Sequence, residues 1–445
     1  MKYIRRIIHT LLLLAGVNAL PLLGWVWPSD GTRLFLLLFL AAAFVCVNIW
    51  PIPKMCPTKR IQRLAEGCAL LRLFCVTATA TVLIQVLWLS WLAKDSLFPI
   101  WALLDLLTAV LLEAVIFWNG MLRVYLTSVQ LGIGHRVKAA LCGWIPLVNI
   151  WYLAKIIRIA GEEVEFETQK WELDAVRAEN EICRTKYPLL MVHGVFFRDF
   201  RYLNYWGRIP KELVRNGATV YYGQQQSAAA VEDSGKELAA RIRQIVEETG
   251  CGKVNIIAHS KGGLDSRAAI AHAGCAPYVA TLTTINTPHR GCIFAEYLLN
   301  KAPEALRQKA AAAYNAALKR LGDPNPDFLA AVTDLTESAC LARNQTTPDA
   351  PGVLYESVMS YCRKARHGKF PLNMTYPIVK HFDGLNDGLV SVESAKWGTF
   401  TLLEPKGKRG ISHGDVIDLN RENIPGFDVR EFYVKLAADL KRRGY

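Results

Sequence analysis

The amino-acid sequence predicts an all-α N-terminal part that crosses a membrane, followed by a C-terminal α/β domain. Three observations predict this. Long apolar segments crowd into the first 160 residues, and short apolar runs alternate with amphipathic helices after residue 187. The third observation is that residues 253–267 (KVNIIAHSKGGLDSR) have the pattern of a buried strand, a tight turn and a helix. We therefore expect transmembrane helices in residues 1–160, a charged linker in 161–186 and the α/β domain in 187–445.

Four apolar segments are long enough to cross a bilayer, which takes roughly 20 helical residues. The first has a basic start like that of a secretion signal. It lacks a convincing small-residue cleavage site and further spans follow it, so we expect it to be retained. The sequence thus predicts about four transmembrane helices. They are residues 7–27, 34–50, 70–93 and 98–118.

The basic residues of the chain concentrate in its apolar part. Residues 1–160 contain 15 Lys and Arg against 5 Asp and Glu. They cluster at the N-terminus, in the loop 54–63 and after the fourth span, which by the positive-inside rule are cytoplasmic. This distribution favours membrane loops over a nucleic-acid surface. It predicts a multi-pass protein of the cell membrane with a cytoplasmic C-terminal domain.

A fifth apolar stretch, residues 139–157, bears on that orientation. It contains Gly143, Pro146 and Asn149 and has basic residues on both flanks. These features favour a re-entrant or interfacial segment over a span. If the stretch does span, the C-terminal domain lies on the opposite side of the membrane.

Two carboxylates, Asp105 and Glu113, lie inside the fourth predicted span. Carboxylates at membrane depth are functional candidates by default. The simpler interpretation is that they face other helices and pair with Arg72 or Arg123, and we expect this one because nothing else resembles a transport pathway.

The eleven cysteines are scattered and form no CxxC pair. This usage fits reduced thiols better than a disulfide framework, and no zinc-ligand spacing is present. We expect no metal or cofactor from this pattern.

The region after residue 187 alternates strands and helices, which is typical of α/β domains. Strands are predicted at residues 188–193, 219–222, 253–258, 280–286, 353–360 and 399–403. Helices are predicted at residues 202–216, 233–249, 263–273 and 428–443.

The turn around Ser260 has the small-x-Ser-x-Gly pattern of a nucleophile elbow. A serine in such a strained turn needs small neighbours two residues before and after it, and Ala258 and Gly262 meet that need. A helix begins directly after it, and the free N–H groups of a helix N-terminus favour negative charge. The strand–turn–helix setting makes Ser260 the candidate nucleophile.

Residues from about 187 to 440 resemble bacterial true lipases of the α/β-hydrolase fold, the group typified by Pseudomonas and Burkholderia triacylglycerol lipases. The matching words occur in the same order: YPLLMVHGVF, ATVYYGQQQS, KVNIIAHSKGG, INTPHRG, NDGLVSVESAKWG and SHGDVIDLN. The resemblance implies an α/β-hydrolase catalytic domain that cleaves acyl esters of lipids.

A serine nucleophile needs an imidazole base that is oriented by a carboxylate, and in this fold the chain order is Ser, acid, His. Asp387 lies in the turn-rich segment GLNDGLVS, and His413 is the single histidine after it. We therefore predict a Ser260–Asp387–His413 triad. Asp383, four residues earlier, is the alternative acid.

The oxyanion hole needs two backbone N–H groups. Lys261, directly after the nucleophile, supplies one, and the resemblance implies Val195 as the other donor. His193 and His259 are expected to orient their loops through hydrogen bonds rather than to act as bases.

The resemblance also implies an amphipathic lid, which residues 294–332 match in position; a plain packed helical insertion is the alternative. The lipase group binds a structural calcium ion between two aspartates. Asp415 matches one of them, but no aspartate lies between Asp349 and Asp383 to supply the other. We therefore expect activity without calcium.

Three functions remain open from the sequence. The first is a membrane-anchored serine ester hydrolase acting on lipid acyl esters, and the second is a lipid acyltransferase with the same triad. The third is a non-catalytic membrane protein that binds a lipid or a partner. Acyl chain length, head group and oligomeric state have no recognisable signature.

Overall fold

The computed structural model describes residues 2–25, 30–52, 56–92, 98–195, 204–320, 322–406 and 408–445. The chain divides into two compact units, residues 1–173 and 174–445. The stretch expected to be a linker or stalk, residues 161–186, is helical through Arg177, in keeping with its helix-prone sequence. Its first part belongs to the N-terminal unit and the rest to the C-terminal unit.

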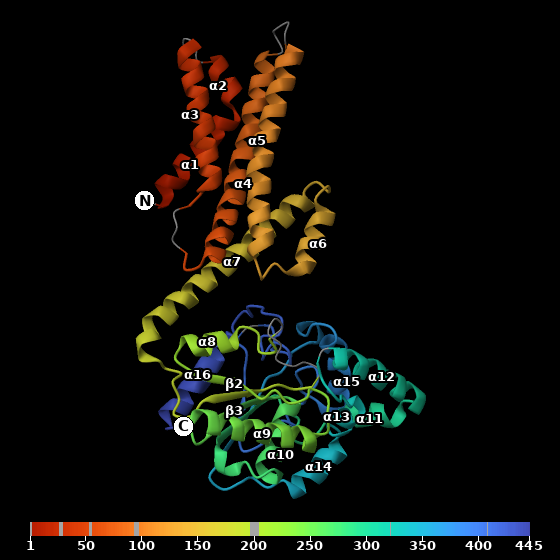
Figure 1. The fold of residues 1–445 in the computed structure, drawn as a ribbon. Helices are drawn as coiled ribbons and strands as arrows, with labels where there is room; N and C mark the ends of the chain where they lie inside the picture. The colour runs from red at the N-terminus through yellow and green to blue at the C-terminus, as the bar shows by residue number, and fades with distance from the viewer. Residues whose placement is uncertain are drawn as a thin grey trace. The chain divides into compact units, whose positions relative to one another are not determined.

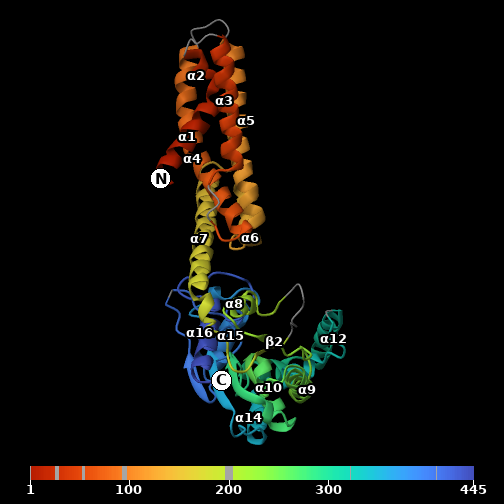
Figure 2. The same cartoon turned by 60° about the vertical axis from the view of Figure 1, so that its left-hand side comes forward.

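The N-terminal unit is entirely helical in the part that the structure describes (Figures 1 and 2). Its helices are α1 (Lys2–Val17), α2 (Ala19–Trp25), α3 (Asp30–Ile49), α4 (Lys59–Leu92), α5 (Phe98–Thr127), α6 (Gly132–Cys142) and α7 (Val148–Arg177).

Three of the described helices are long and apolar enough to cross a membrane, within Gly31–Ile49, Lys59–Ser90 and Leu103–Thr127. The expected count of about four is not confirmed. The first predicted span is divided at Asn18 into α1 and α2. The buried Asn18 side chain donates one hydrogen bond to the Leu14 carbonyl and another, of 2.9 Å, to Thr81 Oγ1. A polar side chain held in this way ties the break to the neighbouring helix α4.

The stretch 139–157 is not one continuous helix. α6 ends at Cys142, a turn containing Pro146 follows, and α7 begins at Val148. Several large apolar side chains of this turn are exposed, Trp144 (85%) and Leu147 (78%) most of all. A broken helix with an exposed apolar turn has the form expected of an interfacial or re-entrant segment.

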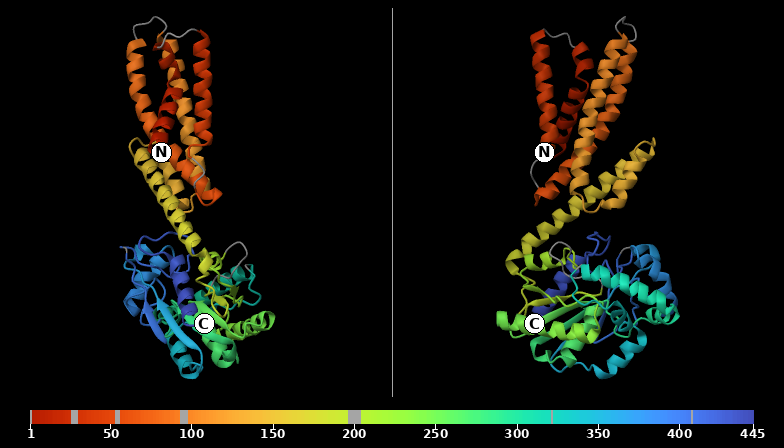
Figure 3. Two further views of the ribbon diagram at one scale, coloured as in Figure 1. Left: turned by 90° about the vertical axis from the view of Figure 1, so that its left-hand side faces the viewer. Right: turned by 45° about the vertical axis from the view of Figure 1, so that its right-hand side comes forward.

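Helices α4 and α5 lie side by side along their length (Figures 2 and 3). A Cβ atom on Gly67 would lie 3.0 Å from the Gly120 carbonyl oxygen, so the two backbones approach closely at these glycines. Small residues at such crossings are typical of helix packing in membranes.

The two carboxylates of the fourth predicted span are buried within the bundle, as expected. The expected pairing of Glu113 with Arg123 is wrong. Arg123 pairs with Glu66 at 2.5 Å, while Glu113 accepts hydrogen bonds from Thr77 and Thr81. The arginine lies about ten residues beyond Glu113 on the same helix, too far along its axis to reach it.

The C-terminal unit contains a six-stranded sheet in the order β2-β1-β3-β4-β5-β6, and every neighbouring pair is parallel. Each strand agrees with its prediction to within one residue. The strands are β1 (Leu189–Val192), β2 (Val220–Tyr222), β3 (Val254–His259), β4 (Val279–Ile285), β5 (Leu354–Met359) and β6 (Thr399–Leu402).

The described helices of this unit run in chain order between and after the strands (Figure 1). They are α8 (Ile209–Arg215), α9 (Val231–Thr249), α10 (Lys261–His272), α11 (Ile293–Lys301), α12 (Glu304–Arg320), α13 (Phe328–Thr333), α14 (Glu337–Thr346), α15 (Leu372–Asp383) and α16 (Val429–Arg442). The helix predicted for residues 202–216 begins only at Ile209; residues 202–203 lie outside the described part of the chain.

Helices cover both faces of the sheet, as its continuous apolar strands require. Leu189 and Met191 of β1 pack with the helices α8 and α16, and the alternate residues Leu190 and Val192 pack with α9 and α10. This is the α/β-hydrolase architecture that was predicted. Because all six strands are parallel, the segments that follow them meet at one edge of the sheet, where ligands bind in such folds.

Candidate active site

Ser260 stands between β3 and α10 in a strained backbone conformation, with φ 55° and ψ −130°. A non-glycine residue in such a region costs about 1–3 kcal/mol and persists only where its surroundings impose it. Here they do. A Cβ atom on Gly262 would lie 2.4 Å from the His193 carbonyl oxygen, and Thr287 Oγ1 donates to the Ser260 carbonyl at 2.8 Å. The small-residue requirement inferred at position 262 is therefore a contact with the β1 loop.

His413 and Asp387 are brought together from loops 26 residues apart. Their Nδ1 and Oδ2 atoms lie 2.6 Å from each other, and the His413 backbone N–H also donates to the Asp387 carbonyl. With Nδ1 as the donor, Nε2 is left as the basic nitrogen. Asp387 follows β5 and His413 follows β6, so both reach the same sheet edge as Ser260.

The Asp387 carboxylate is fully buried and well supplied with donors. Its Oδ1 accepts the backbone N–H groups of Leu389 and Val390, and its Oδ2 accepts Asn286 Nδ2 at 2.6 Å. Asn286 has φ 48° and follows β4 directly. It was not predicted to have a role. The sequence feature that could have identified Asn286 is its position directly after a predicted strand, in the segment INTPH.

The alternative acid, Asp383, lies elsewhere. It ends α15 and accepts the backbone N–H groups of Ile293 and Phe294 in the first turn of α11, while burial raises the pKa of its carboxyl group. A carboxylate in that position caps a helix N-terminus. Its neighbourhood accounts for the residue without a role at His413.

The side chain of Lys261 is buried and forms an ion pair with Asp265. Its Nζ lies 2.7 Å from Asp265 Oδ1 and 3.0 Å from Ser234 Oγ. Burial raises the pKa of Asp265 to about 6, although Lys261 opposes the shift. Because the ammonium group of Lys261 is bound to Asp265 and Ser234, its backbone N–H is the group of residue 261 that can bind a substrate. Val195 lines the same cavity as Ser260, and a Cβ atom on its neighbour Gly194 would lie 2.8 Å from Ser260 Cβ.

The two other histidines at the site bind loops together. The His193 ring contacts the carbonyl oxygens of Gly194 and Gln225 at 2.8 and 3.0 Å. His259 Nδ1 lies 2.6 Å from the Tyr205 hydroxyl, and its ring centroid is 4.4 Å from that of His413. Burial and the nearby His413 hold the pKa of His259 well below its usual range. His259 is thus neutral, and its ring packs against the ring of His413.

An apolar cavity of about 410 Å³ opens beside Ser260. Apart from Ser260 and Arg307, its described lining is apolar, and much of it comes from α11, α12 and α13. Leu298, Leu299 and Leu306, three of the residues that suggested a lid, lie in this lining. The described residues of the stretch 294–332 therefore supply much of the lining of this apolar cavity.

The residues around Asp415 do not fit the calcium ion of the lipase group. Both carboxylate oxygens accept hydrogen bonds from the Arg409 guanidinium, at 3.0 and 3.1 Å, and Oδ2 also accepts the N–H and O–H of Ser412. No cluster of three or more metal-ligating His, Cys, Asp or Glu side chains occurs in the part of the chain that the structure describes. An arginine fills the cationic position next to this aspartate.

The chain resembles known esterases and lipases in this region. Residues 190–320 match a family model described as "Putative serine esterase (DUF676)". The chain is 34% identical over 189 residues to a triacylglycerol lipase of Burkholderia plantarii, covering 40% of this chain and 52% of that protein. It is 35% identical over 179 residues to one of Pseudarthrobacter phenanthrenivorans, covering 37% and 55%. The chain thus spans about half the length of these relatives.

Among solved structures, the Staphylococcus hyicus lipase aligns at 18% identity and a TM-score of 0.46, covering 58% of this chain and 96% of that one. A Bacillus licheniformis lipase, BlEst2, aligns at 24% identity and a TM-score of 0.41, covering 53% and 88%. The parallel sheet, the strained serine turn and these sequence relatives agree. In its C-terminal unit, the chain is thus similar to serine esterases and triacylglycerol lipases, on a parallel α/β sheet.

Proposed function

We propose that this protein is a membrane-anchored serine ester hydrolase that cleaves acyl esters of lipids. The observation that carries the proposal is the 2.6 Å hydrogen bond between His413 and Asp387, made at the sheet edge where Ser260 stands in its strained turn. A buried carboxylate bonded to the imidazole of a loop histidine, with a serine elbow at the same edge, is the arrangement that acyl transfer to serine requires.

In the proposed reaction, Ser260 Oγ attacks the ester carbonyl carbon while His413 Nε2 accepts the hydroxyl proton. Asp387 stabilises the imidazolium that forms. The N–H groups of Lys261 and Val195 bind the negative oxygen of the tetrahedral intermediate. The C–O bond to the alcohol then breaks, and His413 returns the proton to the leaving oxygen. Water attacks the resulting acyl-serine by the same steps and releases the carboxylic acid.

The cavity supports a lipid acyl chain as the group bound next to Ser260. Its volume of about 410 Å³ falls within the range of small-molecule pockets, and its lining by leucine, phenylalanine, valine and alanine side chains favours hydrocarbon. The bacterial relatives are triacylglycerol lipases, which are enzymes of the same substrate class.

The three apolar helices support anchoring in a membrane. Crossing once in each direction, α4 and α5 would put the basic start of α4 and the basic residues after α5 on one side, and this charge supports a cytoplasmic catalytic unit. An enzyme held there would meet lipid esters of the inner leaflet rather than external fat. The break between α6 and α7 favours this orientation. Residues 139–157 are divided between two helices, so this apolar stretch does not form one helix long enough to cross a bilayer and move the catalytic unit to the other side.

A fluorophosphonate probe tests the proposal on the full chain in detergent. The active enzyme should be labelled at Ser260 and should hydrolyse p-nitrophenyl acyl esters, with both signals absent in Ser260→Ala. A protein that is folded and membrane-bound yet neither labelled nor active would instead be the non-catalytic binding protein. Acyl transfer is distinguished by adding a lipid alcohol and measuring new ester against free acid.

A further inference from the structure

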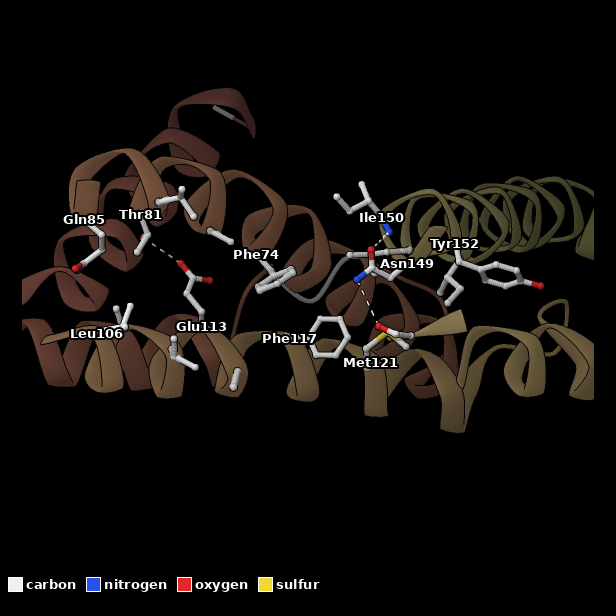
Figure 4. A pocket seen from close by; sticks show the side chains of 18 of the residues that line it. Phe74, Thr81, Gln85, Leu106, Glu113, Phe117, Met121, Asn149, Ile150 and Tyr152 are labelled. Atoms are coloured by element: carbon white, nitrogen blue, oxygen red, sulfur yellow. Dashed lines mark hydrogen bonds between the residues drawn. The ribbon is translucent and has the colours of Figure 1, made fainter. Parts of the chain in front are cut away.

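The N-terminal unit contains a cavity of its own, about 740 Å³ in volume, between α4, α5 and the α6–α7 segment (Figure 4). Most of its lining is apolar, for example Phe74, Leu106, Phe117 and Met121, and no lysine or arginine occurs among the described residues that line it. The volume is that of a ligand pocket. Nothing in the proposed hydrolysis uses this cavity.

One end of the cavity is polar. Thr81, Gln85 and Glu113 gather there, apart from the aromatic side chains Phe74 and Phe117 (Figure 4). Thr81 donates to Glu113 Oε1 at 3.3 Å. Asn18 connects Thr81 to Gln85, because its side-chain amide donates to Thr81 Oγ1 and accepts from Gln85 Nε2.

This network leaves an acceptor without a donor. Gln85 is only 6% exposed and lines the cavity, yet its Oε1 atom has no hydrogen-bond partner. A buried polar atom in that state is unfavourable. The hydroxyl and amide donors around it are directed at other acceptors, and the neighbouring Asp105 carboxylate also has no donor for either oxygen among the described residues. A hydroxyl group that enters from the cavity would supply a donor to Gln85 Oε1.

The depth of the polar end selects the ligand. Glu113 stands 15 residues after the start of α5 and 14 before its end, which at 1.5 Å per residue is about 21–23 Å from either end. If α5 crosses the membrane as proposed, Glu113 lies near the middle of the ~30 Å hydrocarbon layer, and Gln85, five residues before the end of the apolar segment Lys59–Ser90, lies inside that layer on one side of the middle. A phosphate or ammonium head group is costly there, whereas an uncharged hydroxyl group is not.

We propose that this cavity binds a neutral lipid alcohol of the diacylglycerol type, whose hydroxyl group donates to Gln85 Oε1 beside Glu113 while its chains lie along Phe74, Phe117 and Met121. The proposal rests on the membrane arrangement proposed above, and it extends the proposed chemistry because ester hydrolysis frees a hydroxyl group on the lipid. The second site then binds the class of product that the first site releases.

Photo-crosslinking tests this in phosphatidylcholine nanodiscs with the full chain carrying Ser260→Ala, so that the probe is not consumed. The probe is a diacylglycerol with a diazirine in one acyl chain, and the labelled peptides are mapped by mass spectrometry. Label is expected on α4, α5 and the start of α7. Unlabelled diacylglycerol should compete, while its methyl ether, which lacks the donor, and phosphatidic acid should compete on the order of tenfold less well.

Matched variants locate the site. Gln85→Leu should weaken competition by diacylglycerol on the order of tenfold and abolish its advantage over the methyl ether. Ala114→Phe, which fills the cavity, should remove the label. The controls Thr79→Val and Ala41→Phe change exposed positions of α4 and α3 outside the cavity and should leave the label unchanged.

Equal competition by the alcohol and its methyl ether, or label spread over the outer helix surfaces in Gln85→Leu and parent alike, would overturn the proposal. The result is independent of hydrolysis, since the nucleophile is absent throughout. Failure of the membrane proposal would be seen separately, as extraction of the protein from membranes by alkaline carbonate.

Discussion

At the scale of single residues, Ser260 concentrates the expected chemistry. Ser260→Ala should lower kcat/KM for p-nitrophenyl esters on the order of 10⁴-fold or more, because no other group can form the acyl-enzyme. The control is Ser338→Ala, which removes an exposed hydroxyl group of α14 and should retain full activity. Near-identical Tm values of both variants and the parent establish that folding is intact. A Ser260→Ala enzyme with a tenth of the parent activity would refute the assignment.

Asp387 and Asp383 give a second test, since the two carboxylates have different neighbours. Asp387→Asn should cost on the order of 10³- to 10⁴-fold in kcat, because an amide cannot stabilise the imidazolium of His413. Asp383→Asn should leave kcat within a few-fold and act on stability, through the cap of α11. Steady-state kinetics with a thermal melt of each variant separates the two effects. The reverse order of kcat losses would identify Asp383 as the acid.

At the scale of elements, helices α11–α13 determine what the cavity beside Ser260 can hold. Leu298→Trp adds bulk to that lining, so kcat/KM for long acyl chains should fall on the order of tenfold relative to short ones. Leu341→Trp places the same change on an exposed position of α14 and serves as the control. The measurement is kcat/KM over a series of ester chain lengths. A uniform loss for all lengths would argue that these helices do not bind the acyl chain.

The loop of Arg409 and Asp415 gives a prediction about metal removal. EDTA should change neither activity nor Tm, because the Arg409 guanidinium already neutralises the buried Asp415. Arg409→Gln should lower the stability of this unit by about 2 kcal/mol, or roughly 4–8 °C in Tm, as a buried carboxylate loses a charged donor. Lys408→Gln, an exposed neighbour, should have no effect. Inactivation by the chelator with recovery on adding calcium would show a metal site.

At the scale of the whole molecule, the side of the membrane that carries the active site is open to experiment. Val176 at the end of α7 is 81% exposed, while the nearby Cys183 is buried and its thiol pKa is raised to about 12 by that burial. Val176→Cys, in a background with the exposed Cys46 and Cys75 replaced by alanine, should react with a membrane-impermeant maleimide only after cells are permeabilised. The background without Val176→Cys is the control. Labelling of intact cells would place the catalytic unit outside.

The positions of the strands and of the turn at Ser260 depend on residues adjacent in the chain, so the sequence by itself determines them. The strands of the sheet were predictable to within one residue, because a buried parallel strand is a short apolar run bounded by turns. The elbow at Ser260 was predictable for a similar reason, since its small neighbours Ala258 and Gly262 are adjacent in the chain. The uniqueness of His413 after Asp387 made these two residues candidates without any structure.

Tertiary structure decided what depends on residues far apart in the chain. Asp383 and Asp387 are alike in sequence, and only the closure of the β5 and β6 loops places one beside His413 and the other at α11. The break of the first predicted span has a local cause, because Pro21 cannot donate to the Val17 carbonyl, but the partner of Asn18 is Thr81, 63 residues away. Hydropathy records how apolar a segment is, but it does not record which polar side chain a neighbouring helix offers. Such pairings are set by packing in three dimensions, which local patterns do not contain.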